Sequence, residues 1–174
     1  MLRIQGQTLK PKDRKILSEF AKWVLDKFVI PSVQQKATIL VEFIDPKTLP
    51  KKEQKELHRY KAWLIYNGKK NEKRNFTITI EEAMLLKFKN AKNPILRLEA
   101  ALECLGHELI HIKQYLNGET FDYKEGDVRF RGERFTNWEK GEAYWFSPWE
   151  LEAYGYEQGL YAVFKEKFKG KFKG

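Results

Sequence analysis

The sequence predicts one α+β domain in which a small antiparallel sheet packs on a helix that carries a His-Glu-x-x-His motif. Two observations predict this class. Several long stretches place apolar residues at spacings of three and four, and shorter runs are rich in β-branched residues and end at turn residues. The 174 residues are 42% hydrophobic, which suits a single core. We expect the domain to cover residues 1–164 and a flexible basic tail to follow at 165–174.

The first predicted helix runs from Lys12 to Phe28. Its apolar residues recur every three or four positions, as in an amphipathic helix with one buried face. They are Ile16, Leu17, Phe20, Trp23, Val24 and Phe28. Pro31 is expected to end the helix, because proline has no backbone N–H to donate.

Three runs are predicted to form the sheet. Residues 37–44 are rich in β-branched side chains and end at a turn of Asp and Pro. A second run covers residues 60–66. A third run, Phe76 to Ile80, alternates apolar and polar residues with the two-residue period of a half-exposed strand. Asn67 and Gly68 open a charged connection between the last two runs, and together these features predict antiparallel pairing.

The motif lies within a helix whose two ends are both marked in the sequence. Asn93 and Pro94 are typical of a helix start, and Asn117 and Gly118 are typical of a helix end. The apolar residues between them keep helical spacing along the whole length. They are Ile95, Leu98, Leu102, Leu105, Leu109, Ile112 and Leu116. The motif histidines are therefore expected on a helix that packs into the core.

The C-terminal part of the chain is predicted to contain one long helix. Residues 119–146 are rich in glycine and in alternating aromatic and charged residues, which indicates short strands or an ordered loop. Ser147 and Pro148 then open a helix that reaches Phe164. The chain ends in two copies of Lys-Phe-Lys-Gly, which favour a frayed terminus over a tail that binds anionic partners.

The motif itself, His107-Glu108-Leu109-Ile110-His111, predicts a metal centre. Two histidines four residues apart lie on one face of a helix, about 5–6 Å from each other, and can bind the same ion. Glu108 is offset from the ion but can reach a water molecule bound to it, where a carboxylate acts as a general base. We expect Zn²⁺, although other divalent ions also accept imidazole and carboxylate ligands.

A catalytic zinc site has three protein ligands and one open position, so the motif needs a further ligand. None of the three histidines in the chain follows the motif, and a carboxylate is therefore expected. The C-terminal helix offers Glu150 and Glu152, which lie nearly opposite each other around a helix. We choose Glu150, because Tyr154 would then share its face and could hydrogen-bond a ligand. Glu152 is the rival.

Residues 107–116 and 148–154 (Pro-Trp-Glu-Leu-Glu-Ala-Tyr) resemble the gluzincin branch of zinc metallopeptidases, and they are similar to phage and bacterial SprT-like or ImmA/IrrE-like domains. The resemblance covers roughly residues 76–158. It implies a zincin-like domain that hydrolyses peptide bonds and binds its substrate along an exposed sheet edge, for which residues 76–80 are the candidate. The chain has no third motif histidine and no cysteine-rich zinc ribbon, unlike SprT proteins, and Tyr154 stands where ImmA/IrrE proteins usually have Asn.

Other residues that are able to bind metals or stabilise charge have simpler explanations. Cys104 lies one turn before the motif, but a lone cysteine on a helix is usually a small buried hydrophobe. His58 lies among Lys and Glu and fits a solvated histidine. Tyr144 and Tyr154 are candidates for stabilising an oxyanion, but most of the eight tyrosines are expected only to pack.

Composition limits the expected environment. Cys104 is the only cysteine, the N-terminus does not resemble a signal peptide, and no apolar run approaches the roughly 20 residues of a membrane helix. We expect a monomer in the cytoplasm of a bacterium or a phage-infected host, with a protein or peptide as its substrate.

Charge leaves a second function open. The net charge of +9 is concentrated in residues 1–15, 51–74 and 165–174, whereas residues 118–160 carry ten acidic and five basic residues. The basic segments allow weak contact with nucleic acid, although a solvated surface is the simpler interpretation. The alternative to a peptidase is therefore a metal-stabilised, non-catalytic binding protein, either a phage accessory factor or one associated with nucleic acid.

Overall fold

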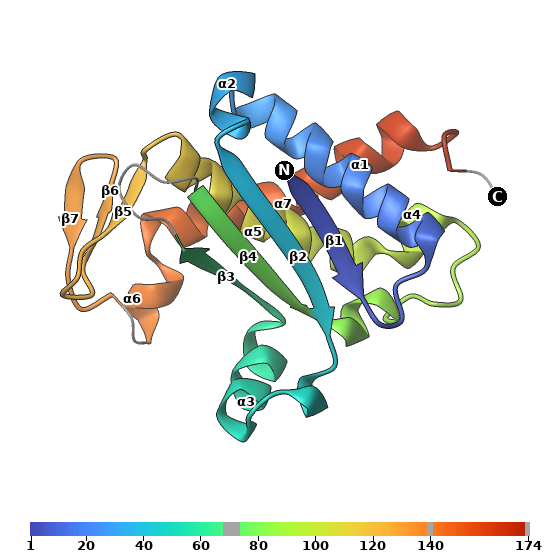
Figure 1. Ribbon diagram of the computed structural model, residues 1–174, viewed down its shortest axis with the longest axis horizontal. Helices are drawn as coiled ribbons and strands as arrows, with labels where there is room; N and C mark the ends of the chain where they lie inside the picture. Colours follow the sequence, from blue (N-terminus) through green and yellow to red (C-terminus); the bar gives the residue numbers. More distant parts are fainter. Residues whose placement is uncertain (68–73, 139–140, 173–174) are drawn as a thin grey trace.

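The computed structural model describes residues 1–67, 74–138 and 141–172, and it has the α+β class expected from the sequence. A four-stranded sheet lies in front of helices α1 (Pro11–Phe28), α5 (Glu99–Leu116) and α7 (Pro148–Phe168) in the view of Figure 1. Helix α5 contacts the sheet, α1 and α7, so it is the central helix of the fold. Within the described ranges, no helix combines the length and the apolar character that crossing a bilayer requires.

The sheet is mixed rather than antiparallel. Its strand order is β1 (Leu2–Gly6), β2 (Ala37–Ile44), β4 (Arg74–Glu81) and β3 (Ala62–Asn67). The predicted antiparallel pairing holds for β3 and β4, but β1 pairs with β2, and β2 with β4, in parallel. Long crossover connections make this possible: α1 and α2 (Pro31–Gln34) lie between β1 and β2, and α3 (Lys51–Tyr60) and β3 lie between β2 and β4.

The predicted substrate edge at residues 76–80 is not an edge. These residues belong to β4, which lies between β2 and β3, and Phe76, Ile78 and Ile80 are all buried. Nothing in the sequence indicated this position, because β2 pairs with β4 in parallel across the intervening α3 and β3. Among the described strands β3 pairs with β4 alone, so β3 is the free edge beside the motif helix.

The predicted helix from residue 93 to 117 is divided in two. Asn93 caps α4 (Pro94–Arg97) by accepting a hydrogen bond from the backbone N–H of Ile95 at 2.9 Å. Helix α5 begins only after Leu98, whose ψ of 8° lies outside the α-helical range. Leu98 is fully buried and continues the apolar stripe, so the spacing gives no sign of the break. Two single 3-10 turns, Pro46–Thr48 and Glu82–Leu85, complete the helical segments of the N-terminal part.

Helix α5 packs closely on α1 and α7 next to the motif. Gly106 directly precedes His107, and a Cβ atom at Gly106 would lie 3.4 Å from the ring of Phe20 and 3.7 Å from Leu160. Phe20 also packs edge-on against Phe164, with 5.1 Å between the ring centroids. This close packing fixes the three helices relative to one another and makes the motif part of a rigid core.

The segment expected to form a flexible tail, residues 165–174, begins within helix α7. Helix α7 continues to Phe168, and Phe172 beyond it is only 6% exposed. The rings of Phe168 and Phe172 pack against Phe164, and Lys171 forms an ion pair with Glu19 at 2.5 Å. Burial of these apolar rings extends the domain at least to residue 172. Residues 173–174 lie outside the described part of the chain.

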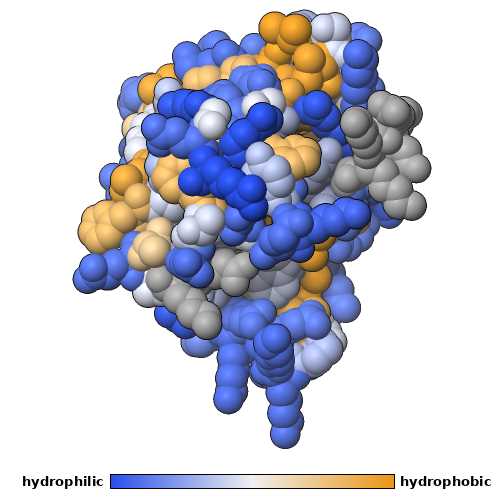
Figure 2. All heavy atoms as spheres, turned by 90° about the vertical axis from the view of Figure 1, so that its left-hand side faces the viewer, coloured by the Kyte–Doolittle hydropathy of each residue, from blue (hydrophilic) through white to orange (hydrophobic). Residues whose placement is uncertain are grey.

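Residues 119–146, predicted as short strands or an ordered loop, contain a second, antiparallel sheet and a short helix. The sheet consists of β5 (Thr120–Asp122), β6 (Val128–Phe130) and β7 (Glu133–Phe135), and α6 (Glu142–Trp145) follows. A small apolar cluster of Val128, Phe130 and Trp149 joins this sheet to the start of α7. Figure 2 views the molecule from this end, where hydrophilic side chains cover most of the surface.

Candidate metal centre

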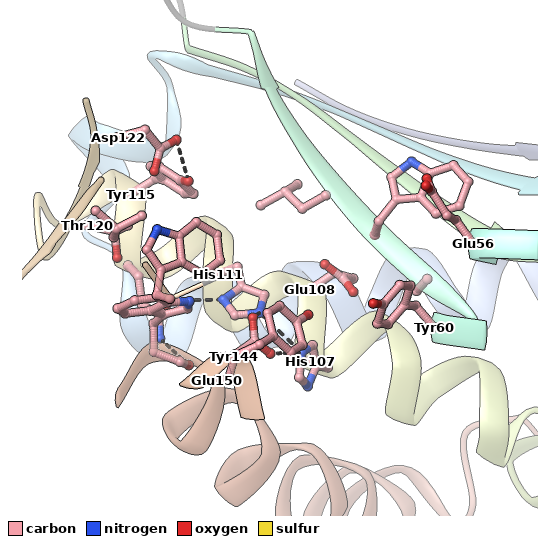
Figure 3. Close-up of a pocket in the computed structure, with 17 residues that line it drawn as sticks. Glu56, Tyr60, His107, Glu108, His111, Tyr115, Thr120, Asp122, Tyr144 and Glu150 are labelled. Atoms are coloured by element: carbon pink, nitrogen blue, oxygen red, sulfur yellow. Dashed lines mark hydrogen bonds and ion pairs between the residues drawn. The ribbon is translucent and has the colours of Figure 1, made fainter. Parts of the chain in front are cut away.

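Three side chains from two helices converge at one point, as Figure 3 shows. His107 and His111 extend from α5, and Glu150 extends from the first turn of α7. The Nε2 atoms of the two histidines lie 3.1 Å apart. The Glu150 carboxylate places Oε2 3.3 Å from Nε2 of His107 and Oε1 3.4 Å from Nε2 of His111. All three residues are largely buried.

These separations fit a tetrahedral ion. Zinc binds imidazole nitrogen and carboxylate oxygen at about 2.0–2.1 Å, which places tetrahedral ligand atoms about 3.3–3.4 Å from each other. The two Nε2 atoms lie 3.1 Å apart, and they lie 3.3 and 3.4 Å from the two different oxygens of the Glu150 carboxylate. In addition, Oε2 of Glu150 is buried and accepts no hydrogen bond from any described residue, so a cation would satisfy it. The donor set of two imidazoles and one carboxylate therefore fits zinc.

The start of α7 aims Glu150 at the two histidines. Ser147 occupies the predicted N-cap position, but its hydroxyl donates to the backbone oxygen of Tyr144 at 2.8 Å instead of capping the helix. Pro148 begins the helix, and Trp149 beside Glu150 is only 5% exposed. The buried indole and the bonded serine hold the first turn of α7 in place, which fixes the direction of the glutamate.

Glu152, the rival to Glu150, points to a different set of partners. Its Oε1 accepts hydrogen bonds from Lys113 at 2.9 Å and Arg131 at 2.7 Å, and its Oε2 accepts one from Gln114 at 2.9 Å. Two residues along a helix correspond to a turn of about 200°, so the two glutamates cannot face the same ion. Only Glu150 joins the group with His107 and His111.

Gln114 supports His111 from behind. Its Oε1 lies 2.9 Å from Nδ1 of His111, and its Nε2 donates to the backbone oxygen of Trp149 at 3.0 Å and to Glu152. Gln114 is 1% exposed. An acceptor at Nδ1 keeps the proton on that nitrogen and leaves Nε2 free for a metal. The same side chain thus orients a histidine on α5 and ties it to the start of α7.

Glu157 lies next to Nδ1 of His107, as Gln114 lies next to Nδ1 of His111. Its Oε2 lies 3.3 Å from Nδ1 of His107. The sequence reasoning assigned a supporting role to Tyr154 instead, but that ring packs against the His107 ring, with 4.5 Å between centroids. Glu157 follows Glu150 by seven residues, two helical turns, and this spacing was a signal in the sequence that pointed to the shared face.

The electrostatics of the site favour a positive charge between these groups. Burial alone lowers the pKa of His107, but the carboxylates of Glu150 and Glu157 outweigh burial and raise the pKa to about 10. Burial alone raises the pKa of Glu150, but the two imidazoles lower it to about 2. Without a metal, the site therefore holds a proton on imidazole next to an ionised carboxylate.

Glu108 lies in the same cavity as the ligand atoms but does not belong to the converging group. The cavity has a volume of about 430 Å³, and Figure 3 shows it bounded by α5, by β3 and by the start of α7. Residues Ala62 to Leu64 of the β3 edge line its wall. Burial raises the pKa of Glu108, which brings a carboxylate closer to the range in which it both accepts and returns protons near neutral pH.

The remaining candidates lie outside the converging group. Cys104 does not join it, and burial raises the pKa of its thiol to about 12, so the thiol stays protonated. His58 is exposed and lies 3.2 Å from a carboxylate oxygen of Glu81. Tyr144 lines the cavity, and burial raises the pKa of its hydroxyl.

Comparison with known proteins identified no relative. No protein-family model, curated protein or solved structure matches this chain.

Proposed function

We propose that this protein is a zinc-dependent peptidase. His107, His111 and Glu150 hold the ion, and Glu108 acts as the general base. The observation that carries the proposal is the convergence of His107, His111 and Glu150 beside a cavity that Glu108 also lines: the two Nε2 atoms lie 3.1 Å apart, and each lies 3.3–3.4 Å from one oxygen of the Glu150 carboxylate. A closed structural site would have a fourth protein ligand and no cavity.

The residues of the chain divide the chemistry between them. Zinc bound by the three ligands supplies a Lewis acid that polarises the scissile carbonyl. Glu108 accepts a proton from the attacking water and returns it to the amine that leaves. Its burial favours the first transfer, because a carboxylate with a raised pKa is a stronger base toward the attacking water.

An extended peptide is the substrate that the cavity shape supports. The free edge strand β3 runs along the cavity, and Ala62, Trp63 and Leu64 line it. An edge strand presents unpaired backbone N–H and C=O groups, which bind an extended peptide by strand addition. The peptide backbone would then pass between β3 and the metal ligands of α5.

The test replaces Glu108 by Gln. The Glu108→Gln variant keeps the shape of the side chain but removes the base, so cleavage of a fluorescently labelled unfolded protein should fall by about 10²–10⁴-fold. Zinc content should stay at the wild-type stoichiometry. Glu103→Gln on the same helix makes the same chemical change away from the cavity and should retain activity.

Two outcomes would contradict the proposal. Full activity in Glu108→Gln would show that another group activates water. A wild-type protein that binds zinc and gains thermal stability, yet cleaves no unfolded protein at any zinc concentration, would show that the centre is structural and would favour the non-catalytic alternative.

A further inference from the structure

The cavity is acidic in a protein that is otherwise basic. Four carboxylates line it, and none of the described residues that line it is a lysine or an arginine. The whole chain nevertheless has a net charge of +9. The charges of Glu108 and Glu150 would be offset by a bound divalent ion, but those of Glu56 and Asp122 would remain.

Asp122 lies at the end of the cavity formed by β5, as Figure 3 shows. The hydroxyl of Tyr115 donates to its Oδ2 at 2.7 Å. Burial and the charge of Asp122 raise the pKa of Tyr115, so this hydroxyl stays protonated and continues to donate. No hydrogen bond from the described residues reaches the second carboxylate oxygen, which remains available to a ligand.

Thr120 gives an independent indication of a ligand at the same end. It lies two residues before Asp122 on β5, and side chains at that spacing share one face of a strand. Thr120 is only 8% exposed, it lines the cavity, and its Oγ1 is buried without any hydrogen-bond partner among the described residues. Buried hydroxyl groups are almost always paired, so this one needs a partner from outside the chain.

Aromatic rings form the remaining walls of this end. Tyr115, Trp138 and Trp149 all line the cavity, and the rings of Trp138 and Trp149 meet edge to face with 5.2 Å between centroids. A hydrogen bond from Nε1 of Trp138 to the backbone oxygen of Gly126 at 2.8 Å fixes the first of these indoles. Aromatic faces next to a carboxylate are the surroundings in which proteins bind ammonium and guanidinium groups.

We propose that Asp122, Thr120 and the surrounding aromatic rings form a subsite for a positively charged side chain, Lys or Arg, of the peptide substrate. The proposal rests on the proposed peptidase function, because it names the substrate class of the same cavity. Asp122 pairs with the charge, Thr120 Oγ1 accepts a hydrogen bond from the same ammonium or guanidinium group, and the indoles cover its apolar stem. An acidic side chain would be repelled there.

The subsite belongs to the β5 end rather than to the α3 end of the cavity. Glu56 and Asp122 are both exposed, so exposure does not distinguish the two ends. None of the described residues that line the α3 end has a buried polar atom without a hydrogen-bond partner to match Thr120. Asp122, in contrast, accepts a hydrogen bond from Tyr115 and lies two residues after Thr120, whose hydroxyl is buried and unpaired.

The experiment uses fluorogenic peptides that differ in a single residue, either Lys, norleucine or Glu, placed in turn at each position near the cleaved bond. Wild-type protein should cleave the Lys peptide about tenfold more efficiently than the norleucine peptide in kcat/KM, which is typical of one hydrogen bond to a charged group. Asp122→Asn should bring this ratio close to one, and Thr120→Val should lower it partly. Glu125→Gln, the same change in charge on the exposed turn after β5, should retain it.

A binding measurement separates this inference from the proposed function. Zinc-loaded Glu108→Gln protein should bind the Lys peptide more tightly than the norleucine peptide in calorimetry, and Asp122→Asn should remove the difference. If binding behaves in this way while wild-type protein cleaves nothing, the peptidase proposal fails and the subsite stands.

Three results would overturn the subsite while leaving the peptidase intact. One is cleavage of all peptides with equal efficiency. Another is a preference for Lys that persists in Asp122→Asn. A third is a preference that disappears in Glu56→Gln but not in Asp122→Asn, which would place the charged side chain at the other end of the cavity.

Discussion

Two regions of the molecule meet at the cavity, and they are built in different ways. The inner region, α5 with the start of α7, carries the metal ligands on long helices that are packed against α1 and the sheet. The outer region consists of the short strands β3 and β5 to β7 (Figure 1), many of whose residues are exposed, and β3, β5 and β6 line the cavity. The proposed chemistry would therefore depend on rigid helices, and the proposed recognition of a substrate would depend on strands whose side chains can vary without disturbing the core.

The sharpest way to test the inner region is to exchange each of the two neighbouring glutamates. Glu150→Gln removes a charged ligand. It should weaken zinc binding by more than the roughly 10–100-fold that is lost when a residue hydrogen-bonded to a metal ligand is replaced. Glu152→Gln makes the same change two residues away and should have the smaller effect, because Glu152 contacts Lys113, Gln114 and Arg131 instead. Competition with a chelator measures both affinities. An equal or larger loss in Glu152→Gln would make Glu152 the ligand.

The sequence predicted the inner region far better than the outer one. The apolar spacing along α5 and the motif itself depend on local helical geometry, so His107, His111 and Glu108 could be placed without knowing the rest of the fold. The angle between positions on a helix showed that only one of Glu150 and Glu152 could face the ion, whereas the choice of Glu150 rested on a hydrogen-bonding role for Tyr154, whose ring instead packs against His107. These inferences all use contacts within one helix or between two helices.

The outer region depends on contacts that are distant in the sequence. β4 is a central strand because β2 pairs with it in parallel, although α3 and β3 lie between β2 and β4 in the chain. Gln114 occupies an ordinary helical position, and its role becomes visible only when α7 brings Trp149 and Glu152 beside it. Thr120 likewise has no motif, because its unpaired hydroxyl is a property of the folded chain.

Substitutions at Gln114 and Glu157 test how strongly zinc binding depends on the residues next to the two histidines. Gln114→Leu removes the acceptor at Nδ1 of His111 and the tie to Trp149, and it should weaken zinc binding by about 10–100-fold. Glu157→Gln keeps an acceptor near Nδ1 of His107 and should cost less. The visible spectrum of bound Co²⁺ reports ligand geometry and should change in Gln114→Leu. An unchanged spectrum and affinity would show that packing alone orients His111.

A change of pH should have a smaller and gradual effect on the inner region, seen in the stability of the metal-free protein and in its affinity for zinc. In the metal-free protein, burial lowers the pKa of His107, but its two carboxylate neighbours outweigh burial and raise the pKa from 6.5 to about 10. Its contribution to the stability of the metal-free protein is therefore fully present below about 6.5 and is lost as the pH rises through about 10. Zinc requires the neutral imidazole, so binding should release about one proton, and affinity should fall by about tenfold for each pH unit below about 10.

Calorimetry in buffers with different ionisation enthalpies counts the released protons, and thermal unfolding with and without zinc follows the stability. As the pH rises from about 7 towards about 10, the melting temperature of the metal-free protein should fall while the increase caused by zinc should grow, because ion and proton compete for the same nitrogen. Glu157→Gln removes one of the charges that raise the pKa and should shift both trends to lower pH. If zinc bound without proton release between pH 6.5 and 9, His107 would already be neutral, and the pairing with Glu150 would not be what holds the metal-free site together.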